Sequence, residues 1–385
     1  MFRLVLARLS IILTLLVCGT TGPAWAQLFE TRAEQAYLVD ADTGTVLFAK
    51  NENDLVPPAS LAKLMTMEVV FNAIHTGRLS LDDTFQVSEN AWRTGGAMSR
   101  TSTMFAELKS SIRLEDLIQG VIVQSANDGC IIIAEGMAGS EDNFARLMTE
   151  RAREIGLTQS VFGNSNGLPH PDSKVTMKDL VTLARHIQST YPEFYRYYSQ
   201  RDFTWNKILQ RNRNPLLGLD IGVDGLKTGF TEESGYAIVA SIKRDGRRLF
   251  LAMGGMTSER ERAEESRKIL EWGIRAFERK TLFAKDETIG ELSVYGGAAS
   301  AIVKASDAID IFIPITNPDR LTARITYGWP LRAPLEAGAQ VGVLKVYIGD
   351  TLSQETPLHV VDAVDKGPLY SQAIDALLEL AQFWL

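Results

Sequence analysis

Residues 57–66 read PPASLAKLMT, and this stretch decides how the rest of the sequence is interpreted. The residues from Leu61 to Ile74 are apolar at nearly every position of the helical period, and a helix without a polar face must be buried. We therefore predict a core helix over 61–74, entered just after the proline pair. Ser60 and Lys63 stand at its start, and residues three apart lie on the same face of a helix.

The segments around this helix predict an α+β fold. Two β-hairpins lie far apart in the sequence, at 36–49 and 236–253, and each has a Gly-containing turn. Thr176 and Asp179 resemble a capping box at the start of a helix. We expect one antiparallel sheet assembled from both hairpins, with a helix cluster packed on it. The helical patterns besides 61–74 lie at 113–122, 128–137, 141–155, 176–189 and 258–277.

The character of the sequence changes after about residue 285. Residues 286–366 contain short alternating strands separated by turn signals, which predicts a small all-β domain. Residues 367–385 have apolar positions at helical spacing, which predicts an amphipathic helix. The part from 370 to 385 contains no Lys or Arg, so attraction to anionic lipid is missing. We expect peripheral contact of residues 370–385 with the inner membrane, with packing on the protein as the alternative.

Residues 1–26 have the pattern of a secretory signal peptide. Arg3 and Arg8 precede an apolar stretch, and Ala24-Trp25-Ala26 fits a cleavage site. An uncleaved membrane anchor is the alternative, but the apolar stretch is too short to span a bilayer comfortably. We therefore expect an exported chain whose first domain occupies residues 27–285.

The composition excludes several classes of protein. The 385 residues carry a formal net charge of −7, with 45% hydrophobic and 23% charged residues, which is typical of a globular chain of two to three domains and gives no basic footprint for nucleic acid. The four histidines are dispersed without ligand spacing, so we expect no metal site and no cofactor. Cleavage of the leader would remove Cys18 and leave Cys130 alone in an apolar run, where we expect it to be buried and inert.

Three short motifs follow one another along the chain, namely Ser60-Leu61-Ala62-Lys63, Ser125-Ala126-Asn127 and Lys227-Thr228-Gly229. Each is weak alone, since a random chain of this length holds about one S-x-x-K, and S-x-N occurs again at Ser88. Their placement strengthens them. Ser60 opens the predicted core helix, Ser125 falls in the break between two helices, and Lys227 leads into the second hairpin at a strand edge.

These residue types fit nucleophilic catalysis by a serine. A serine hydroxyl needs an adjacent base, and Lys63 can be that base if burial and a second cation such as Lys227 lower its pKa. The backbone N–H of Ser60, free at a helix N-terminus, can help to hold an oxyanion. Ser125 can relay a proton to a leaving amine, and Asn127 can fix the lysine and bind a substrate amide.

The strand edge at 227–230 suits an extended peptide as the substrate. An edge strand offers unpaired backbone groups, so the peptide would dock as an added strand. Gly229 has no side chain, which lets that backbone approach closely. We therefore expect the three motifs to meet around a peptide-binding groove.

In this order and in these contexts, the three motifs resemble those of the serine penicillin-recognising enzymes. Within that group the chain resembles the exported serine-type D-alanyl-D-alanine carboxypeptidases, the low-molecular-mass penicillin-binding proteins. The resemblance implies a β-lactamase/penicillin-binding-protein-like catalytic domain, a periplasmic location, no cofactor, and a C-terminal β domain with a membrane anchor. The segments that carry it are 57–66, 125–128, 166–168, 223–229 and 271–273.

The resemblance also implies a mechanism. Ser60 attacks the penultimate D-Ala carbonyl of a peptidoglycan stem pentapeptide, Lys63 is the base, and Ser125 protonates the departing D-Ala. The oxyanion lies between the N–H groups of Ser60 and Phe230. β-Lactams resemble the D-Ala-D-Ala unit, so they should acylate Ser60. The other substrate-binding residues implied are Asn127, Lys227, Thr228, Gly229 and Arg262, with Arg213 as a weaker candidate for the carboxylate.

Some features depart from the family or leave other functions open. Residue 230 is Phe, where many relatives have a polar residue, and this could alter rate or specificity. A class A-like β-lactamase needs a loop carboxylate, but Asp172 is the one acid between Gly156 and Lys174. A D,D-endopeptidase would use the same residues, and a non-catalytic cell-wall-binding protein could share the fold.

Overall fold

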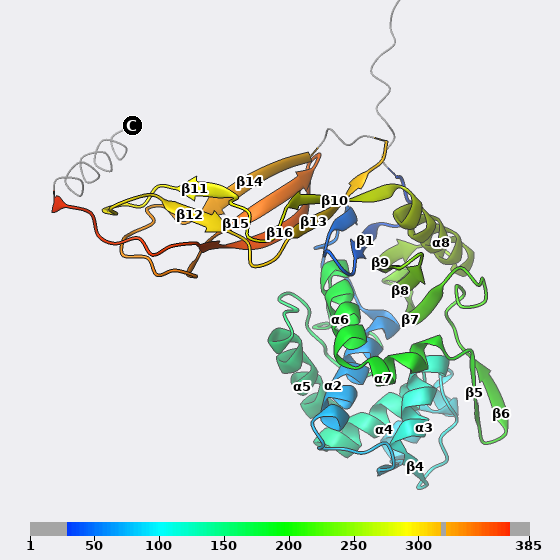
Figure 1. The fold of residues 1–385 in the computed structure, drawn as a ribbon. Coiled ribbons are helices and arrows are strands. Elements are labelled where there is room, and N and C mark those ends of the chain that lie inside the picture. Colours follow the sequence, from blue (N-terminus) through cyan, green and yellow to red (C-terminus); the bar gives the residue numbers. More distant parts are fainter. Residues whose placement is uncertain (1–28, 317–320, 370–385) are drawn as a thin grey trace, which may run out of the picture. The chain divides into compact units, whose positions relative to one another are not determined.

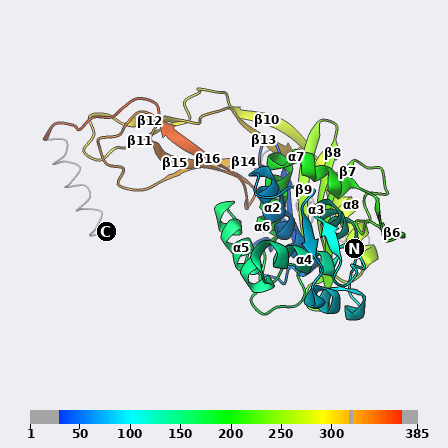
Figure 2. The same ribbon diagram turned by 90° about the horizontal axis from the view of Figure 1, so that it is seen from below.

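The computed structural model describes residues 29–316 and 321–369 (Figures 1 and 2). The predicted leader, 1–26, and the amphipathic part of the C-terminal segment, 370–385, lie outside the described residues. Within them the fold is α+β, as predicted: a sheet with packed helices is followed by an all-β region. No helix of the described part is long and apolar enough to cross a bilayer.

The main sheet has five antiparallel strands in the order β2-β1-β9-β8-β7. The first hairpin joins the second through β1 and β9, in register from Gln35 opposite Gly254 to Asp40 opposite Leu249. The sheet is therefore assembled from both hairpins, as predicted. Strand β7 pairs with β8 in this sheet and forms its edge. The strands are β1 (Gln35–Asp40), β2 (Val46–Lys50), β7 (Val223–Thr231), β8 (Gly235–Arg244) and β9 (Arg247–Met256).

The helices lie on both sides of this sheet, with α8 packed against β8 and β9, and α6 against β1 and β9 (Figure 1). The pattern at 113–122 is divided in the structure into α3 and a π-helical turn, η4. The helices are η1 (Ala59–Ala62), α2 (Lys63–His75), α3 (Leu114–Gln119), η4 (Gly120–Gln124), α4 (Asn127–Ala138), α5 (Glu141–Glu154), α6 (Met177–Thr190), α7 (Pro192–Tyr195) and α8 (Glu259–Arg275).

Short elements complete the helical region. Strands β3 and β4 form one small ladder and β5 and β6 form another. The short strands are β3 (Thr84–Gln86), β4 (Ser111–Arg113), β5 (Asp202–Trp205) and β6 (Ile208–Arg211). The short helices are η2 (Ala91–Gly95), η3 (Ala97–Ser99) and η5 (Arg196–Ser199).

Helix α2 is the core helix that the opening stretch predicts. It is buried from Lys63 to Phe71, and its apolar side chains join one core cluster with α4, α6 and the sheet residues Phe250 and Ala252. Its buried carboxylate, Glu68, accepts hydrogen bonds from Arg151 and from Tyr191, each at 3.0 Å. A buried charge must be paired in this way, because an unpaired one would strongly destabilise the fold.

The capping box predicted at the start of α6 is half formed. Thr176 Oγ1 accepts the hydrogen bond of the Asp179 N–H at 3.1 Å, as an N-cap should. The Asp179 carboxylate does not return to the cap, because it accepts the N–H groups of Gln159 and Ser160 at 3.1 and 2.8 Å. Asp179 therefore ties the 159–160 backbone, which leads into the loop bearing Asn166, to the start of the helix.

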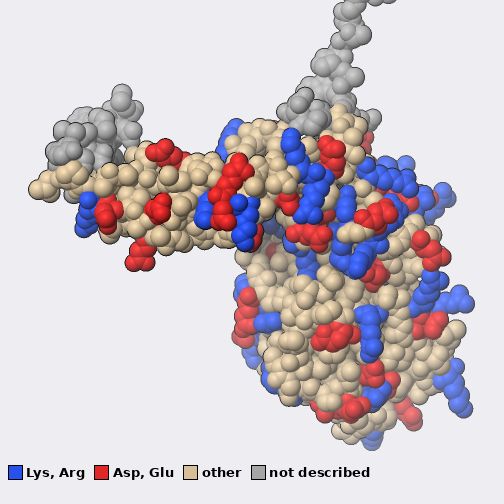
Figure 3. Space-filling view, viewed as in Figure 1, with Lys and Arg blue, Asp and Glu red and all other residues tan. Residues whose placement is uncertain are grey.

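The C-terminal region is all-β, as predicted, with a five-stranded sheet in the order β11-β12-β16-β15-β14 and a two-stranded ladder of β10 and β13. Strand β10 lies before the predicted boundary at 285, yet it pairs with β13 beyond it. On the face in Figure 3, cationic and anionic side chains are interspersed. The strands are β10 (Phe277–Phe283), β11 (Gly290–Leu292), β12 (Ala301–Lys304), β13 (Ile309–Pro314), β14 (Leu321–Tyr327), β15 (Gln340–Ile348) and β16 (Thr351–Val360).

Candidate active site

Ser60 and Lys63 lie at hydrogen-bond distance, as their spacing predicts. Ser60 stands in the 3₁₀ turn η1, so α2 begins at Lys63 rather than at the serine. The turn is entered through Ala59 with φ +48°, a left-handed conformation that is costly for a residue with a Cβ. The Lys63 Nζ lies 3.0 Å from the Ser60 Oγ. The sharp turn thus presents the hydroxyl beside the first side chain of the core helix.

The ammonium of Lys63 is held from three directions. Besides Ser60, it donates to Asn127 Oδ1 at 2.7 Å and to the backbone carbonyl of Asn166. The side chain is 1% exposed, and burial lowers its pKa to about 8, with the positive charge of Arg213 adding to the decrease. A buried lysine with a lowered pKa can accept a proton near neutral pH, which an exposed lysine cannot.

The second lysine, Lys227, lies close enough to Lys63 for the two positive charges to repel one another. Arg213 is a further cation whose charge lowers the pKa of Lys63. Burial lowers the pKa of Lys227 well below its usual value, and the charge of Lys63 adds to this. The Lys227 Nζ donates to the Thr228 carbonyl at 2.8 Å.

Ser125 lies in the break between η4 and α4, as predicted. Its φ is +63°, and its buried Oγ has no hydrogen-bond partner among the described residues. A buried hydroxyl without a partner is rare in proteins, so this one is open to a bound molecule. Asn127, which begins α4, accepts from Lys63 and donates from Nδ2 to Thr101 Oγ1 at 2.9 Å.

A buried carboxylate fixes the loop that faces Ser125. Asp128 accepts hydrogen bonds from the N–H groups of Met104, Ala106 and Gly129, at 3.0, 3.1 and 3.0 Å. It also accepts the hydroxyl of Thr103 at 2.6 Å. Asp128 thereby gives the loop around residues 103–106 a defined path.

The edge strand β7 brings the third motif against the nucleophile turn. A Cβ at Gly229 would lie 3.2 Å from the Cβ of Ala59 and 3.3 Å from the Ser60 nitrogen. Gly229 therefore lets β7 pack closely against the nucleophile turn; close approach of a substrate backbone at Gly229 stays a prediction. Thr228 and Phe230 have their side chains on the other face of the strand, because successive residues alternate.

A cavity of about 400 Å³ joins the three motifs. Among the predicted residues it brings together Ser60, Ser125 and the Thr228–Phe230 segment with Arg262 and Arg213; Lys63, Asn127 and Lys227 are buried and are not in its lining. Arg262, in the first turns of α8, is 6% exposed, and its Nε has no partner among the described residues. Sequence reasoning missed the lining residues Ser102, Pro215, Tyr236 and Glu259, and the Lys63 partner Asn166, although 166–168 had been noted as familial.

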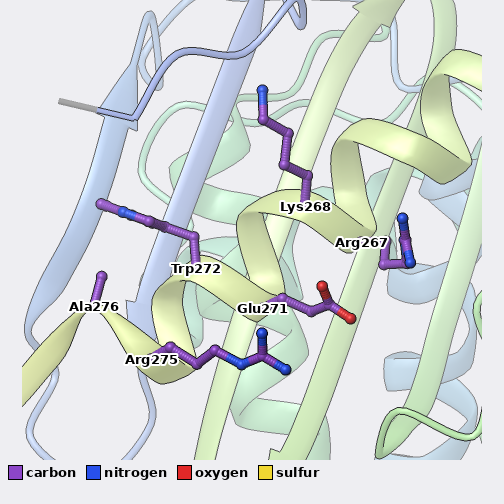
Figure 4. A pocket seen from close by; sticks show the side chains of 6 residues that line it. All are labelled: Arg267, Lys268, Glu271, Trp272, Arg275 and Ala276. Carbon is purple, nitrogen blue, oxygen red and sulfur yellow. The ribbon is translucent and has the colours of Figure 1, made fainter. Parts of the chain in front are cut away.

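Other candidates lie away from this cavity. Asp172, the one loop acid that a β-lactamase could use, lines a different hollow beside α5. Cys130 is buried, as predicted, and burial raises the pKa of its thiol to about 12, which disfavours the reactive thiolate. In 29–316 and 321–369 no three His, Cys, Asp or Glu side chains are grouped to hold a metal ion. A hollow on α8 is lined by Arg267, Trp272 and Arg275, none of which lines the cavity (Figure 4).

A serine paired with a buried lysine, a second serine and a lysine-bearing edge strand define the serine penicillin-recognising enzymes. The chain belongs to the D-alanyl-D-alanine carboxypeptidase family, peptidase family S11, whose model matches residues 21–257. The C-terminal domain of penicillin-binding protein 5 matches residues 277–366. The resemblance to low-molecular-mass penicillin-binding proteins is thereby confirmed.

Known relatives match over most of their length. The D-alanyl-D-alanine carboxypeptidase DacC of Escherichia coli is 35% identical over 351 residues, which are 90% of this chain and 88% of the relative. The crystal structure of penicillin-binding protein 5 from Haemophilus influenzae is 33% identical, with a TM-score of 0.72, and is covered in full by 90% of this chain. Penicillin-binding protein D2 from Listeria monocytogenes, solved with ampicillin bound, is 27% identical with a TM-score of 0.56, and 64% of this chain covers 99% of it.

Proposed function

We propose that the chain removes the terminal D-Ala from peptidoglycan stem pentapeptides through an acyl-enzyme on Ser60. The observation that carries this proposal is the 3.0 Å contact between Ser60 Oγ and the buried Nζ of Lys63, whose pKa is lowered to about 8. Serine-type carboxypeptidase activity is the activity of the family, and binding of peptidoglycan and of β-lactams goes with it.

The chemistry follows from these contacts. The Ser60 Oγ attacks the carbonyl carbon of the penultimate D-Ala while its proton passes to Lys63 Nζ. The N–H groups of Ser60 and Phe230 hold the resulting oxyanion. The C–N bond then breaks as the D-Ala amine takes a proton through Ser125, whose hydroxyl is otherwise unpartnered. Water hydrolyses the remaining ester and frees Ser60.

The substrate is oriented by the edge of β7. The extended stem peptide adds to this edge as a further strand. Thr228 and Arg262 hold its terminal carboxylate, and Arg213 lines the same cavity as a second cation. Lys227, which is buried outside the lining, supports Thr228 through the hydrogen bond to the Thr228 carbonyl. Asn127 keeps Lys63 in place through its Oδ1 and offers an amide to the substrate.

β-Lactams should acylate the same serine. The ampicillin-bound and cefotaxime-bound structures of the Listeria relative support this, since both ligands are β-lactams. Turnover of the lactam should be slow, because the acid of the loop between 156 and 174, Asp172, is not in the lining of the cavity. A β-lactamase is therefore disfavoured, and an intact Ser60–Lys63 pair disfavours a non-catalytic protein.

Endopeptidase action on cross-links is the remaining alternative. It would use the same residues, and a D-alanyl-D-alanine endopeptidase of Pseudomonas aeruginosa is a relative, 28% identical over 224 residues. That match covers 54% of this chain, whereas the carboxypeptidase relatives match over both the catalytic and the C-terminal regions. The carboxypeptidase is accordingly favoured.

The organisation of the chain belongs to this proposal. A leader over 1–26 would direct export to the periplasm, and a catalytic domain, 27–285, would be followed by a β domain, 286–366, and a helix, 367–385. The pairing of β10 with β13 and the second family match both favour a junction nearer to residue 277. Contact of 370–385 with the inner membrane would hold the enzyme near its substrate.

Labelling with a fluorescent penicillin, read by intact mass, tests the proposal together with release of D-Ala from a pentapeptide. We expect the wild type to gain one label and to release D-Ala, and Ser60→Ala to do neither. Ser88→Ala is the matched control, because Ser88 belongs to the second S-x-N match but does not line the cavity. An unlabelled wild type, or D-Ala release by Ser60→Ala, would overturn the proposal.

A further inference from the structure

An exposed aromatic ring lines the cavity beside the catalytic groups. Phe230 follows the Lys-Thr-Gly motif and is 49% exposed, although it is one of the largest apolar side chains. Its ring lies against that of Tyr236, with the centroids 4.2 Å apart and the planes tilted by 31°, and the two residues are a cross-strand pair of β7 and β8. Both residues line the cavity, and about half of Phe230 is exposed.

The aromatic pair also seats the arginine of the cavity. The guanidinium of Arg262 lies 5.6 Å from the centre of the Tyr236 ring, within the range of a cation–π contact. Arg262 is almost fully buried, and its Nε has no partner among the described residues. Tyr236 thus contacts both Arg262 and the ring of Phe230.

The position of the pair indicates which part of the substrate it meets. Thr228 and Phe230 are two residues apart on a regular part of β7, so their side chains share one face of the strand. That face carries the groups expected to hold the terminal carboxylate, Thr228 and Arg262. The residue that bears this carboxylate is the one that leaves, so its side chain must lie close to Phe230.

We propose that Phe230, supported by Tyr236, is a specificity-determining residue that binds the side chain of the departing D-amino acid and favours apolar side chains larger than the methyl of D-Ala. The proposal rests on the proposed function, because it takes the orientation of the substrate from it. The enzyme would then act on stem peptides that end in D-Leu-like or D-Phe-like residues as well as in D-Ala.

The physical reason is the apolar surface that such a side chain would remove from water. The methyl group of D-Ala covers little of the exposed ring, whereas a branched or aromatic side chain can cover much of it. Each methylene that becomes buried in an apolar site changes kcat/KM by about tenfold or more. The cavity is open on the ring side, so a smaller gain is expected here than in a closed pocket.

The experiment compares model peptides that differ in the last residue alone. The substrates are diacetyl-L-Lys-D-Ala-D-X with X as Ala, Leu or Phe, and the readout is the free D-amino acid, from which the ratio of kcat/KM for D-Leu over D-Ala is formed. We expect Phe230→Ala and Phe230→Gln to lower this ratio about fivefold to tenfold relative to wild type. Phe230→Leu keeps an apolar side chain and should retain most of the ratio.

Phe105→Ala is the matched control, since Phe105 is an exposed aromatic residue that does not line the cavity, and it should leave the ratio unchanged. An unchanged ratio in Phe230→Ala would overturn the proposal, and a raised ratio would too, because it would mean that the ring excludes large side chains. A wild type that neither releases D-Ala nor takes up the penicillin label would overturn the proposed function as well. A wild type that does both, with a ratio insensitive to residue 230, would overturn the specificity proposal alone.

Discussion

The two regions of the described chain bury different kinds of residue. The region before β10 buries charged side chains, among them Lys63, Lys227 and Arg262. These three lie in or near the lining of one cavity. In the C-terminal β region, within the described residues, the buried side chains are apolar except for Ser353. Burial of charge is costly, so an ordinary core avoids it.

The difference shows in which region the chain gives up folding stability in order to hold catalytic groups. A lysine whose pKa is lowered by burial is less stable as an ammonium than one in water, yet only such a lysine is a base near neutral pH. The C-terminal sheet has no such requirement and follows the usual pattern of an apolar interior. Substitutions of buried residues in the two regions should therefore differ in their effect on activity.

The largest loss of activity is expected from removal of the base, Lys63. Lys63→Met keeps an unbranched side chain of similar length in the buried site but cannot accept a proton from Ser60. We expect acylation by a β-lactam, followed by stopped-flow fluorescence, to slow about 10³-fold, which is the usual range for loss of a general base. Lys174→Met, at a half-buried lysine that pairs with Glu233 and does not line the cavity, should acylate at the wild-type rate. Acylation of Lys63→Met at the wild-type rate would show that another group takes the proton from Ser60.

The pH dependence of kcat/KM tests the cause of that effect. Lys63 must be unprotonated to act, and its pKa is about 8, so kcat/KM should rise about tenfold per pH unit below 8 and level off above it. Arg213→Gln removes a positive charge that lowers this pKa, so the rising limb should move to higher pH. If the pH at which kcat/KM levels off were the same in Arg213→Gln and wild type, Arg213 would not contribute to the lowered pKa of Lys63.

Replacement of the buried carboxylate Asp128 is expected to have a smaller effect, on the free energy of unfolding. Asp128→Asn weakens four hydrogen bonds that end on one charged group, so it should lower the free energy of unfolding by about 2 kcal/mol. Urea denaturation of the wild type and of Asp128→Asn measures this difference in free energy. Glu107→Gln, whose side chain is exposed on the same loop, should be neutral. Equal stability of all three proteins would count against Asp128 as the anchor of the loop.

The smallest effect on activity is expected in the C-terminal sheet. Leu358 is fully buried there, and Leu358→Ala should lower the free energy of unfolding by about 3 kcal/mol through loss of apolar contacts and the cavity left behind. D-Ala release by the folded protein should stay within about twofold of wild type. Ile302→Ala, at an exposed position of the same sheet, is the control. A large loss of activity in Leu358→Ala would break the contrast between the two regions.

Much of this arrangement could be predicted from sequence because it follows local rules. The apolar run from Leu61 fixes the core helix, the Asp245-Gly246 turn fixes a hairpin, and the spacing of Ser60 and Lys63 fixes their contact. The edge position of β7 also followed from the place of Lys227-Thr228-Gly229 just before the second hairpin. These features depend on neighbours in sequence, which a single chain reveals.

The rest depends on contacts between distant segments. Tyr236 and Glu259 reach the cavity because β8 pairs with β7 and α8 packs on β8, and nothing in their own segments marks them. Asp179 bonds to the 159–160 backbone instead of completing a capping box, since that backbone offers two N–H groups nearby. The Asn166 carbonyl carries no side-chain signal of any kind.

That carbonyl determines how the site tolerates mutation. Lys63 is held there by a main-chain oxygen, which every amino acid has, so the contact itself does not require an Asn side chain. The buried Asn166 side chain instead shapes the loop, because its Oδ1 accepts the Leu168 N–H at 2.9 Å. Gly167 is more tightly constrained: its φ is +77°, and a Cβ there would lie 1.8 Å from the carbonyl oxygen of Ala59. The position of the catalytic lysine thus depends on a loop whose shape leaves no room for a side chain at residue 167.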